Sequence, residues 1–327
     1  MSVPDEFNFT ENMLIPIMMD PPQHTLYRAL ISPFFSPKAI AALESGIREL
    51  AISLLQGLRP RGECNFIDDF ALHLPINIFM RLVDLPLEHR TGLLNLVDRI
   101  QHPSKEKKDD VLKRIIAYLV PVIAERKANP GVDMLSQLTK ARIDGRELFD
   151  RELHQICALL LIGGLDSVAS TMGLIANFLA GSPAHRRDLI EHPELLPNAI
   201  EELLRRFPVV TGPGRYVMKD IVFKGVELKK GDHIILPRAL YNLDDRLFTD
   251  PMQVDWRRPR PIHVSFGAPG SPHRCPGSFL ARSEIGIFLT EWLKRIPNFK
   301  VKPGAAVKYE GGFNVSLREL PLVWDPQ

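Results

Sequence analysis

The stretch SFGAPGSPHRCPGSFLARSEI, residues 265–285, joins a stiff loop to a run with helical periodicity. It contains three glycines, three prolines and Cys275, one of only three cysteines in the chain. The thiol would lie just before a helix N-terminus, where the helix dipole favours an anion and lowers the thiol pKa. Such a thiolate could ligate a metal or act as a nucleophile, although His273 is poorly placed to serve as its base. A buried cysteine that acts as a small apolar side chain is the alternative.

The composition narrows the class of protein. The 327 residues correspond to one large domain or two average ones, and 45% hydrophobic residues suffice for a core. A net charge of +2 gives no case for nucleic-acid binding. The three cysteines lie far apart and form no C-x-x-C, so we expect neither a zinc site nor disulfides, and a cytoplasmic protein. The N-terminal residues lack the basic and apolar regions of a signal peptide.

The run from Ile156 to Ala180 raises the question of a membrane span. Its sole charge is Asp166, and its length would cross a bilayer. The Gly163–Gly164 pair and Asp166 lie in the middle of the run, where a charge is costly in lipid. We therefore expect a buried core helix and no membrane contact.

Helical periodicity dominates the sequence, and strand patterns are few and late. We expect short strands at 221–223, 226–228 and 233–236, separated by turn residues. The sequence contains no internal repeat and no Ser/Gly linker. It predicts a mainly α single domain over residues 1–327 with a small β component. The predicted helices are 36–58, 74–83, 88–100, 111–127 with a kink at Pro121, 151–180, 183–192, 196–207 and 276–296.

The predicted helix 151–180 contains the unusual segment LLIGGLDSVAS. Its two adjacent glycines each cost about 1 kcal/mol relative to alanine in a helix. The carboxylate of Asp166 costs more to bury unless it is paired. An acid beside the hydroxyl of Ser167 could pass protons to a group lying against the glycine face. A kinked helix with a salt-bridged aspartate is the alternative.

Two further patterns are weak when taken singly. Glu202 and Arg205 in EELLRRF share a helix face at i, i+3 and can form an ion pair. His24 and Arg28 in DPPQHTLYR would project to one side of a helix, if this stretch is helical, and could bind an anion. Taken alone, the Glu202–Arg205 spacing indicates an ordinary surface ion pair, and the His24–Arg28 stretch indicates the start of a helix after two prolines.

The four patterns, in this order, resemble the cytochromes P-450. PHRCPG is similar to the haem-thiolate loop of that family, and GGLDS is similar to its oxygen-activation helix. ELLR resembles its Glu-x-x-Arg pair, and DPPQHTLYR resembles the Asp-Pro-Pro-x-His-x-x-x-Arg of its bacterial members. Further segments, including GLRPRGECNF, KKGDHIILP and LPLVWDP, resemble the soluble camphor-hydroxylating branch. The resemblance covers essentially the whole chain and implies the cytochrome P-450 fold.

The resemblance implies a haem b cofactor and a role for each matched residue. Cys275 would be the axial thiolate ligand of the iron, a ligand that favours O–O cleavage. Asp166 and Ser167 would deliver protons during oxygen activation. Glu202 and Arg205 would form a buried structural pair on the proximal side. The haem propionates would be neutralised by His24, Arg28, Arg215 and His273, and room for oxygen beside the helix would come from Gly163 and Gly164.

The resemblance also implies a substrate and partners. Leu14, Val210 and the glycine-bearing helix would line the distal pocket, and Asn12 would replace a hydrogen-bonding tyrosine of the camphor enzyme. The substrate would be a small apolar molecule, such as a terpenoid with a carbonyl or hydroxyl group, and dioxygen would be the co-substrate. A basic proximal face that includes Arg28 would dock an acidic 2Fe–2S ferredoxin, itself reduced by an NAD(P)H-dependent reductase.

Three departures from the family pattern have consequences. Ser167 replaces the usual threonine and lacks the methyl group that restricts χ1, so we expect activity with some uncoupling to peroxide. Phe266 lies nine residues before Cys275 instead of the usual seven, so either the loop bulges or the ring no longer shields the sulfur. Few residues precede Asp20, which predicts a truncated N-terminal part with an exposed sheet edge and apolar surface.

These observations favour a haem-thiolate monooxygenase that inserts one oxygen atom of dioxygen into a C–H bond. A truncated or inactive haem-binding protein without monooxygenase turnover is the main alternative. A peroxide-driven oxygenase is disfavoured, because Asp166 and Ser167 would supply proton machinery that peroxide bypasses. A last alternative is a helical protein–protein interaction domain without a cofactor. A colourless purified protein would favour it, because haem is coloured.

Overall fold

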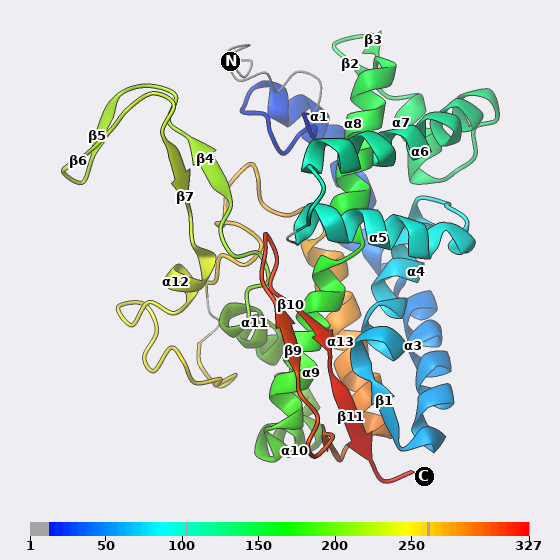
Figure 1. The fold of residues 1–327 in the computed structure, drawn as a ribbon, viewed down its shortest axis with the longest axis vertical. Coiled ribbons are helices and arrows are strands. Elements are labelled where there is room, and N and C mark those ends of the chain that lie inside the picture. The colour runs from blue at the N-terminus through cyan, green and yellow to red at the C-terminus, as the bar shows by residue number, and fades with distance from the viewer. Residues whose placement is uncertain (1–12, 103, 260–261, 327) are drawn as a thin grey trace.

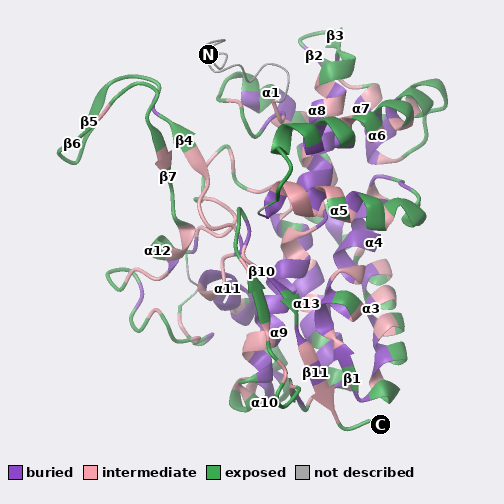
Figure 2. Ribbon diagram, in the orientation of Figure 1, coloured by how far each residue is buried: buried purple, intermediate pink, exposed green. Residues whose placement is uncertain are grey.

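The computed structural model of the protein describes residues 13–102, 104–259 and 262–326 (Figure 1). A helical body is flanked by a smaller lobe built around strands β4 (Gly214–Tyr216) and β7 (His233–Ile235). Helices α9 (Ser167–Ala180) and α13 (Ser278–Arg295) run through the body and are largely buried (Figure 2). The mainly α fold with a small β component is therefore confirmed.

The helix predicted over 36–58 forms two helices. Ser36 caps the first, α2 (Pro37–Ala41), because its Oγ accepts a hydrogen bond from the N–H of Ala39. The second, α3 (Glu44–Leu58), packs its apolar face against α13. The stretch that contains the His24–Arg28 spacing is helical and forms α1 (Gln23–Ile31).

The single helix predicted over 151–180 is wrong in one respect. The chain forms α8 (Asp150–Gly164) and α9, and Leu165 and Asp166 lie between them and belong to neither helix. Two glycines followed by an aspartate weaken the helix at this point, because glycine costs backbone entropy and aspartate prefers helix starts. The stretch Asp150–Ala180 is long and apolar enough to cross a membrane, but most of it is buried inside the protein. It is a core element, as expected.

The other predicted helices are confirmed to within three residues at each end. Helix α6 continues through Pro121. These helices are α4 (His73–Leu82), α5 (Arg90–Gln101), α6 (Lys108–Ala128), α10 (Pro183–Glu191), α11 (Leu196–Arg206) and α13. Short helices that the periodicity did not indicate are η2 (Ser32–Phe35), η3 (Arg59–Arg61), the π-helical η4 (Ile67–Ala71), η5 (Leu87–His89), α7 (Met134–Thr139), η6 (Pro193–Leu195) and α12 (Arg238–Asn242).

The strands are short and antiparallel. The central sheet has the order β1 (Glu63–Asn65), β11 (Pro321–Trp324), β8 (Phe299–Val301), so it joins chain segments far apart in sequence. The predicted strands 221–223 and 226–228 form a hairpin, whose turn residues Lys224 and Gly225 both have positive φ. The two-stranded sheets are β2 (Arg142–Ile143) with β3 (Arg146–Glu147), β4 with β7, β5 (Ile221–Phe223) with β6 (Val226–Leu228), and β9 (Lys308–Glu310) with β10 (Ser316–Glu319).

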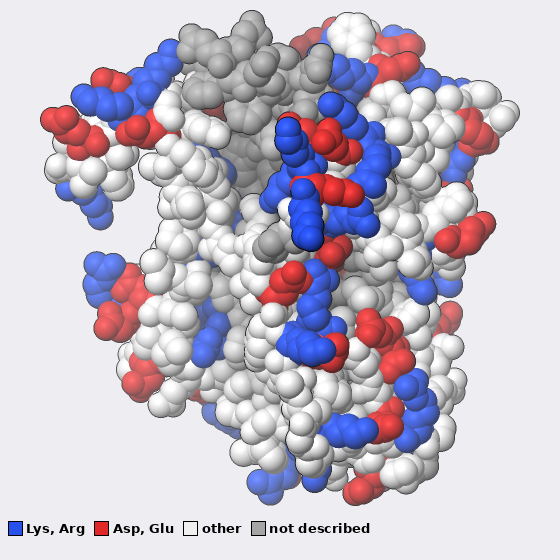
Figure 3. All heavy atoms as spheres, viewed as in Figure 1, with Lys and Arg blue, Asp and Glu red and all other residues white. Residues whose placement is uncertain are grey.

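The lobe around β4 and β7 differs from the body in its surface. Several of its apolar side chains are exposed, whereas the helices of the body bury theirs (Figure 2). The exposed side chains include Val222, Phe223, Val226, Ile235 and Leu240. Basic and acidic side chains intermingle over the face of the body seen in Figure 3 and form no large field of one sign.

Candidate functional site

The loop that carries Cys275 closes on itself. The N–H of Cys275 donates a hydrogen bond to the carbonyl of Phe266, with an N···O distance of 2.8 Å. Gly267 and Gly270 have φ of +91° and +76°, a region that favours glycine. The longer spacing between Phe266 and Cys275 is therefore taken up by a bulge, and the backbone of Phe266 stays beside that of Cys275. Of the two alternatives for this loop, the structure shows the bulge.

The thiol of Cys275 lies just before α13, whose N-cap is Gly277. Burial raises the pKa of this thiol, while the backbone N–H of Gly277 and the guanidinium groups of Arg28, Arg238 and Arg282 act in the opposite direction. Desolvation of the half-buried thiol thus opposes the effect expected from the helix N-terminus and outweighs it in the free thiol. The surroundings nevertheless stabilise an anion, and ligation to a metal would displace the proton.

Four predicted anion-binding residues converge on this loop from three parts of the chain. The His24 and His273 rings lie 4.3 Å apart between centroids, and Arg28 donates a hydrogen bond to the Arg274 carbonyl at 2.7 Å. Burial and then the charge of Arg215 lower the pKa of His273. Burial, followed by His273 and Arg28, lowers the pKa of His24.

The same cluster has an unfilled hydrogen-bonding capacity. Nδ1 of His24 is buried and has no hydrogen-bond partner among the described residues. The carboxylate that faces the cluster, Asp20, lies 3.9 Å from Nε2 of His273 and is largely exposed. An arrangement of neighbouring cations with an unpaired buried ring nitrogen destabilises the folded protein unless an anion binds there. These residues therefore fit a group with two carboxylates and a metal that accepts sulfur.

Arg238 also belongs to this cluster, although it was not among the residues predicted from sequence motifs. It begins α12, and its Nη1 donates a hydrogen bond to the Ser265 carbonyl at 2.7 Å. Burial lowers the pKa of Arg238, and the nearby Cys275 opposes this shift. A lone arginine between a short strand and a five-residue helix matches no motif, so only the fold reveals its proximity to the thiol.

The break between α8 and α9 places Asp166 and Ser167 at one end of a glycine pair. The two glycines have different surroundings: a side-chain carbon added at Gly163 would meet nothing within 4 Å, whereas one at Gly164 would lie 2.5 Å from the ring of Phe79. The expectation that both glycines leave open room thus holds only for Gly163, because Phe79 packs over Gly164. Ser167 Oγ donates a hydrogen bond to the carbonyl of Gly163 at 3.2 Å.

The carboxyl group of Asp166 is held by neutral groups. Asn314 Nδ2 donates to its Oδ2 at 3.0 Å, and Ser170 Oγ donates to its Oδ1 at 3.3 Å. Burial raises the pKa of Asp166, and the charge of His102 opposes this shift. Asp166 therefore forms no salt bridge among the described residues. Its hydrogen bonds come from an amide and a hydroxyl, and the charged groups lie farther away. Asn314, absent from the sequence predictions, lies 148 positions from Asp166 and carries no motif.

Two of the three predicted substrate-contact residues, Leu14 and Val210, lie within the described residues. Val210 forms an isolated antiparallel bridge with Asn314, so it lies next to the residue that holds Asp166. Leu14 is half-buried and packs against the apolar core. Asn12 lies outside the described residues. Val210 is thus near the helix break.

Glu202 and Arg205 form a fully buried pair on α11. Both side chains are 0% exposed, and Arg205 Nε lies 2.8 Å from Glu202 Oε2. The guanidinium also donates to the backbone carbonyls of Asn242, Pro251 and Gln253. The pair therefore fixes α11 to the irregular segment after α12, and it is not an ordinary surface ion pair.

Comparison with known proteins agrees with this geometry. A sequence model for the family Cytochrome P450 matches residues 87–320. A relative from Sinorhizobium fredii, "Probable cytochrome P450 127A1", is 35% identical over 95% of this chain and 75% of its own length. The crystal structure of CYP101J2 is 39% identical and has a TM-score of 0.87 over 99% of this chain and 80% of its own. For CYP101C1 the identity is 38% and the TM-score 0.84, over 95% and 79% of the two chains.

Proposed function

The chain belongs to the cytochrome P450 family, and on this premise we propose that Cys275 ligates its haem iron and that Asp166 and Ser167 supply protons. As a family member it is an oxidoreductase, a monooxygenase that uses haem b. Haem with a thiolate ligand supplies, when bound, the reductive activation of dioxygen and the transfer of one oxygen atom to substrate. The convergence of cationic side chains and the unpaired His24 nitrogen around Cys275 carries the proposal.

The cation cluster gives the haem carboxylates their partners. Arg28, Arg215, His24 and His273 would pair with the two propionates, and charge-assisted hydrogen bonds of this kind are the stronger ones. The lowered pKa values of His24 and His273 mean that both rings are neutral while no anion is bound, and a neutral ring can still donate a hydrogen bond to a propionate. Arg238 would lie close enough to the thiolate to stabilise its charge.

The helix break gives the site its proton donors. Burial holds the pKa of Asp166 above its usual range, so this carboxyl group can take up and release a proton nearer neutral pH. The Ser167 hydroxyl donates to the Gly163 carbonyl, beside the open space that Gly163 leaves. Asp166 would release its proton toward the open space beside Gly163, and the Ser167 hydroxyl would donate a hydrogen bond next to the reacting oxygen.

The substrate and electron donors are proposed at a coarser level. We assign a small apolar substrate, such as a terpenoid, to the pocket near Leu14, Val210 and Gly163. Arg28 on α1 and the exposed Arg274 present positive charge beside the Cys275 loop, which suits an acidic 2Fe–2S ferredoxin with an NAD(P)H-dependent reductase. A cytoplasmic location follows from these soluble partners.

The experiment that tests the proposal is the difference spectrum of the reduced, purified protein with carbon monoxide, followed by turnover assays. We expect the red-shifted Soret band of a thiolate-ligated haem, and product formation with a ferredoxin–reductase pair. A spectrum of histidine-ligated haem would overturn the role of Cys275. A thiolate spectrum without turnover on any of a panel of terpenoids would support the haem-binding alternative.

A further inference from the structure

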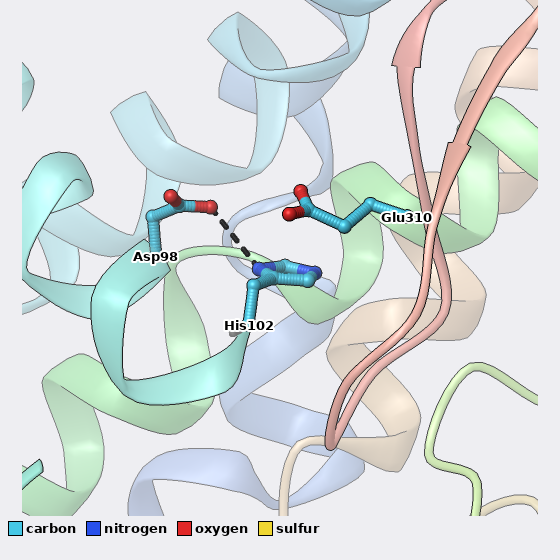
Figure 4. Close-up of side chains that lie close together, drawn as sticks. All are labelled: Asp98, His102 and Glu310. Atoms are coloured by element: carbon cyan, nitrogen blue, oxygen red, sulfur yellow. Dashed lines mark ion pairs between the residues drawn. The ribbon is translucent and has the colours of Figure 1, made fainter. Parts of the chain in front are cut away.

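A buried histidine lies between Asp166 and the protein surface. His102 forms the C-cap of α5, and its side chain is 1% exposed. Its Nδ1 lies 3.1 Å from Oδ1 of Asp98, one turn earlier on the same helix (Figure 4). Its Nε2 lies 3.0 Å from Oγ of Ser316 on β10. Each ring nitrogen therefore contacts a polar group, and one of these groups reaches solvent, since Asp98 is 38% exposed.

The outer end of this cluster is closed by an arginine. Arg318 Nη2 lies 2.6 Å from Oδ1 of Asp98, and Arg318 also pairs with Glu310 on β9. Asp98, His102 and Glu310 come close enough together to hold a metal ion (Figure 4). However, the guanidinium of Arg318 pairs with both carboxylates and lies where a metal ion would bind them. The cluster of Asp98, His102, Glu310 and Arg318 is better explained by its connection to Asp166, which lies on its inner side.

The inner end leads to Asp166 through two amides. Gln101 precedes His102 on α5, and Asn314 Nδ2 donates hydrogen bonds both to Gln101 Oε1 and to Asp166 Oδ2. The backbone is held close here as well, because the N–H of Phe313 donates to the carbonyl of Gln101 at 2.8 Å. The end of α5 and the segment from Asn314 to the start of β10 thus meet in two adjacent contacts, Gln101–Asn314 and His102–Ser316.

The charges around His102 favour its cationic form. Burial lowers the pKa of His102, but the 3.1 Å contact with the Asp98 carboxylate and the charge of Asp166 outweigh it, so the pKa is raised overall. Arg318 opposes the cation, and Glu310 faces the ring from β9. In return, His102 is the first of the groups that lower the pKa of Asp166 against the effect of burial. The two side chains therefore influence each other's charge.

We propose that His102 is a positioning residue that keeps Asp166 acidic enough to release its proton, so that the coupling of electron use to product formation depends on the protonation of His102. This inference rests on the proposed function. The coupling between the two side chains is electrostatic, because the amide of Asn314 that donates to Asp166 carries no titratable proton. His102 exchanges its own Nδ1 proton with solvent through the Asp98 carboxylate, so only N–H and O–H bonds form and break.

The direction of the pH dependence follows from the charges. Below its raised pKa, His102 is cationic and favours the Asp166 anion, which makes Asp166 the stronger acid. Above this pKa the charge is lost, Asp166 holds its proton more tightly, and proton delivery slows. Since a slow second proton transfer allows reduced oxygen to leave as peroxide, the peroxide formed per NADH consumed should rise with pH.

The first test is independent of turnover. We would titrate histidines labelled with 15N by NMR in the diamagnetic, reduced, carbon-monoxide-bound holoenzyme, and assign His102 by its loss in His102→Gln. Asp166→Asn should lower the pKa of His102 by about one unit, the size typical of a nearby opposite charge. The matched control is His89, whose Nδ1 lies 2.9 Å from the Tyr118 hydroxyl and which should not shift. An unchanged His102 pKa in Asp166→Asn would overturn the inference.

The second test compares variants in turnover with a surrogate ferredoxin–reductase pair. His102→Gln should form several-fold more peroxide per NADH at low pH and lose the pH step. His102→Arg, with a permanent charge, should keep peroxide low at all pH values, and His89→Gln should behave as wild type. A wild-type pH profile in His102→Gln contradicts the inference. Absence of the thiolate spectrum in the wild type would instead refute the proposed function, so the two failures are distinguishable.

Discussion

The loop around Cys275 surrounds its thiol with guanidinium groups, whereas the break at Asp166 surrounds its carboxyl group with an amide and a hydroxyl. Arg28, Arg238 and Arg282 all favour the anion at position 275. At Asp166 the direct hydrogen bonds come from Asn314 and Ser170. A ligand that stays anionic needs permanent positive charge, while a carboxyl group that must gain and lose a proton needs neutral partners.

The buried carboxyl group of Glu284 sharpens the comparison, because it has neither charged nor neutral hydrogen-bond partners among the described residues. Both carboxyl oxygens of Glu284 on α13 lack hydrogen-bond partners among the described residues, and burial raises its pKa to about 8 from 4.5. The folded protein thus keeps a proton that the unfolded chain releases, so this group costs stability progressively as pH rises from about 4.5 to 8. Glu284→Gln removes that cost.

We expect Glu284→Gln to raise the free energy of unfolding at pH 8 by on the order of 3–5 kcal/mol and to change it little at pH 4.5. Urea unfolding of the holoenzyme at the two pH values measures the difference. The exposed Glu49→Gln serves as the control and should show no pH-dependent gain. An equal gain for Glu284→Gln at both pH values would mean that the carboxyl group is not buried as a neutral acid.

Substitutions at the two sites should separate haem binding from proton delivery. Asp166→Asn keeps the hydrogen-bonding shape but removes the acid, so product formation should fall about 100-fold with an unchanged carbon-monoxide spectrum. Arg28→Gln should instead weaken haem retention by about 10-fold, since it removes a cation next to the loop. Haem titration and product analysis of both variants check this. A loss of haem in Asp166→Asn would erase the distinction between the two sites.

The glycine pair allows a smaller contrast within one helix. Gly164→Ala places a carbon against Phe79 and should lower the free energy of unfolding by about 1–3 kcal/mol. Gly163→Ala meets open space and should change it by less than about 1 kcal/mol. Thermal and denaturant unfolding of the pair measure the effect. Equal destabilisation by both substitutions would contradict the assigned packing of Phe79.

The hydroxyl of Ser167 should give the smallest effect. Ser167→Ala removes the group beside the Gly163 carbonyl and should raise the peroxide formed per NADH a few-fold, with little change in NADH consumption. Ser167→Thr adds the methyl group that restricts χ1 and should lower peroxide formation. The ratio of peroxide to NADH, measured under identical oxygen and substrate concentrations, distinguishes the variants. No change in Ser167→Ala would remove the serine from the proton path.

The sequence predicted the parts of the site that lie within local motifs. Cys275, His24 with Arg28, and Glu202 with Arg205 each sit in a short pattern whose spacing reflects one loop or one helix face. Longer helices were also predictable, because their periodicity extends over many residues. The break at Leu165 and Asp166 was missed, since an apolar run with glycines indicates a buried helix without showing where it stops.

The rest of the site depends on contacts between distant segments. Asn314 contacts both Asp166 and Gln101 from a segment with no motif, and the strands on either side of Asn314, β9 and β10, have only three and four residues. Such strands are too short for a period of two to be recognised. The desolvation of Cys275, which opposes the effect of the helix N-terminus on its pKa, also depends on tertiary packing that a sequence does not show.

The most direct test of the account compares the wild type with Cys275→Ser, each reconstituted with haem, reduced and exposed to carbon monoxide. The wild type should show the red-shifted band of a thiolate ligand, and the serine variant should lose that band together with turnover, while far-ultraviolet circular dichroism stays unchanged. A serine variant that keeps the band would show that the sulfur of Cys275 does not bind the iron.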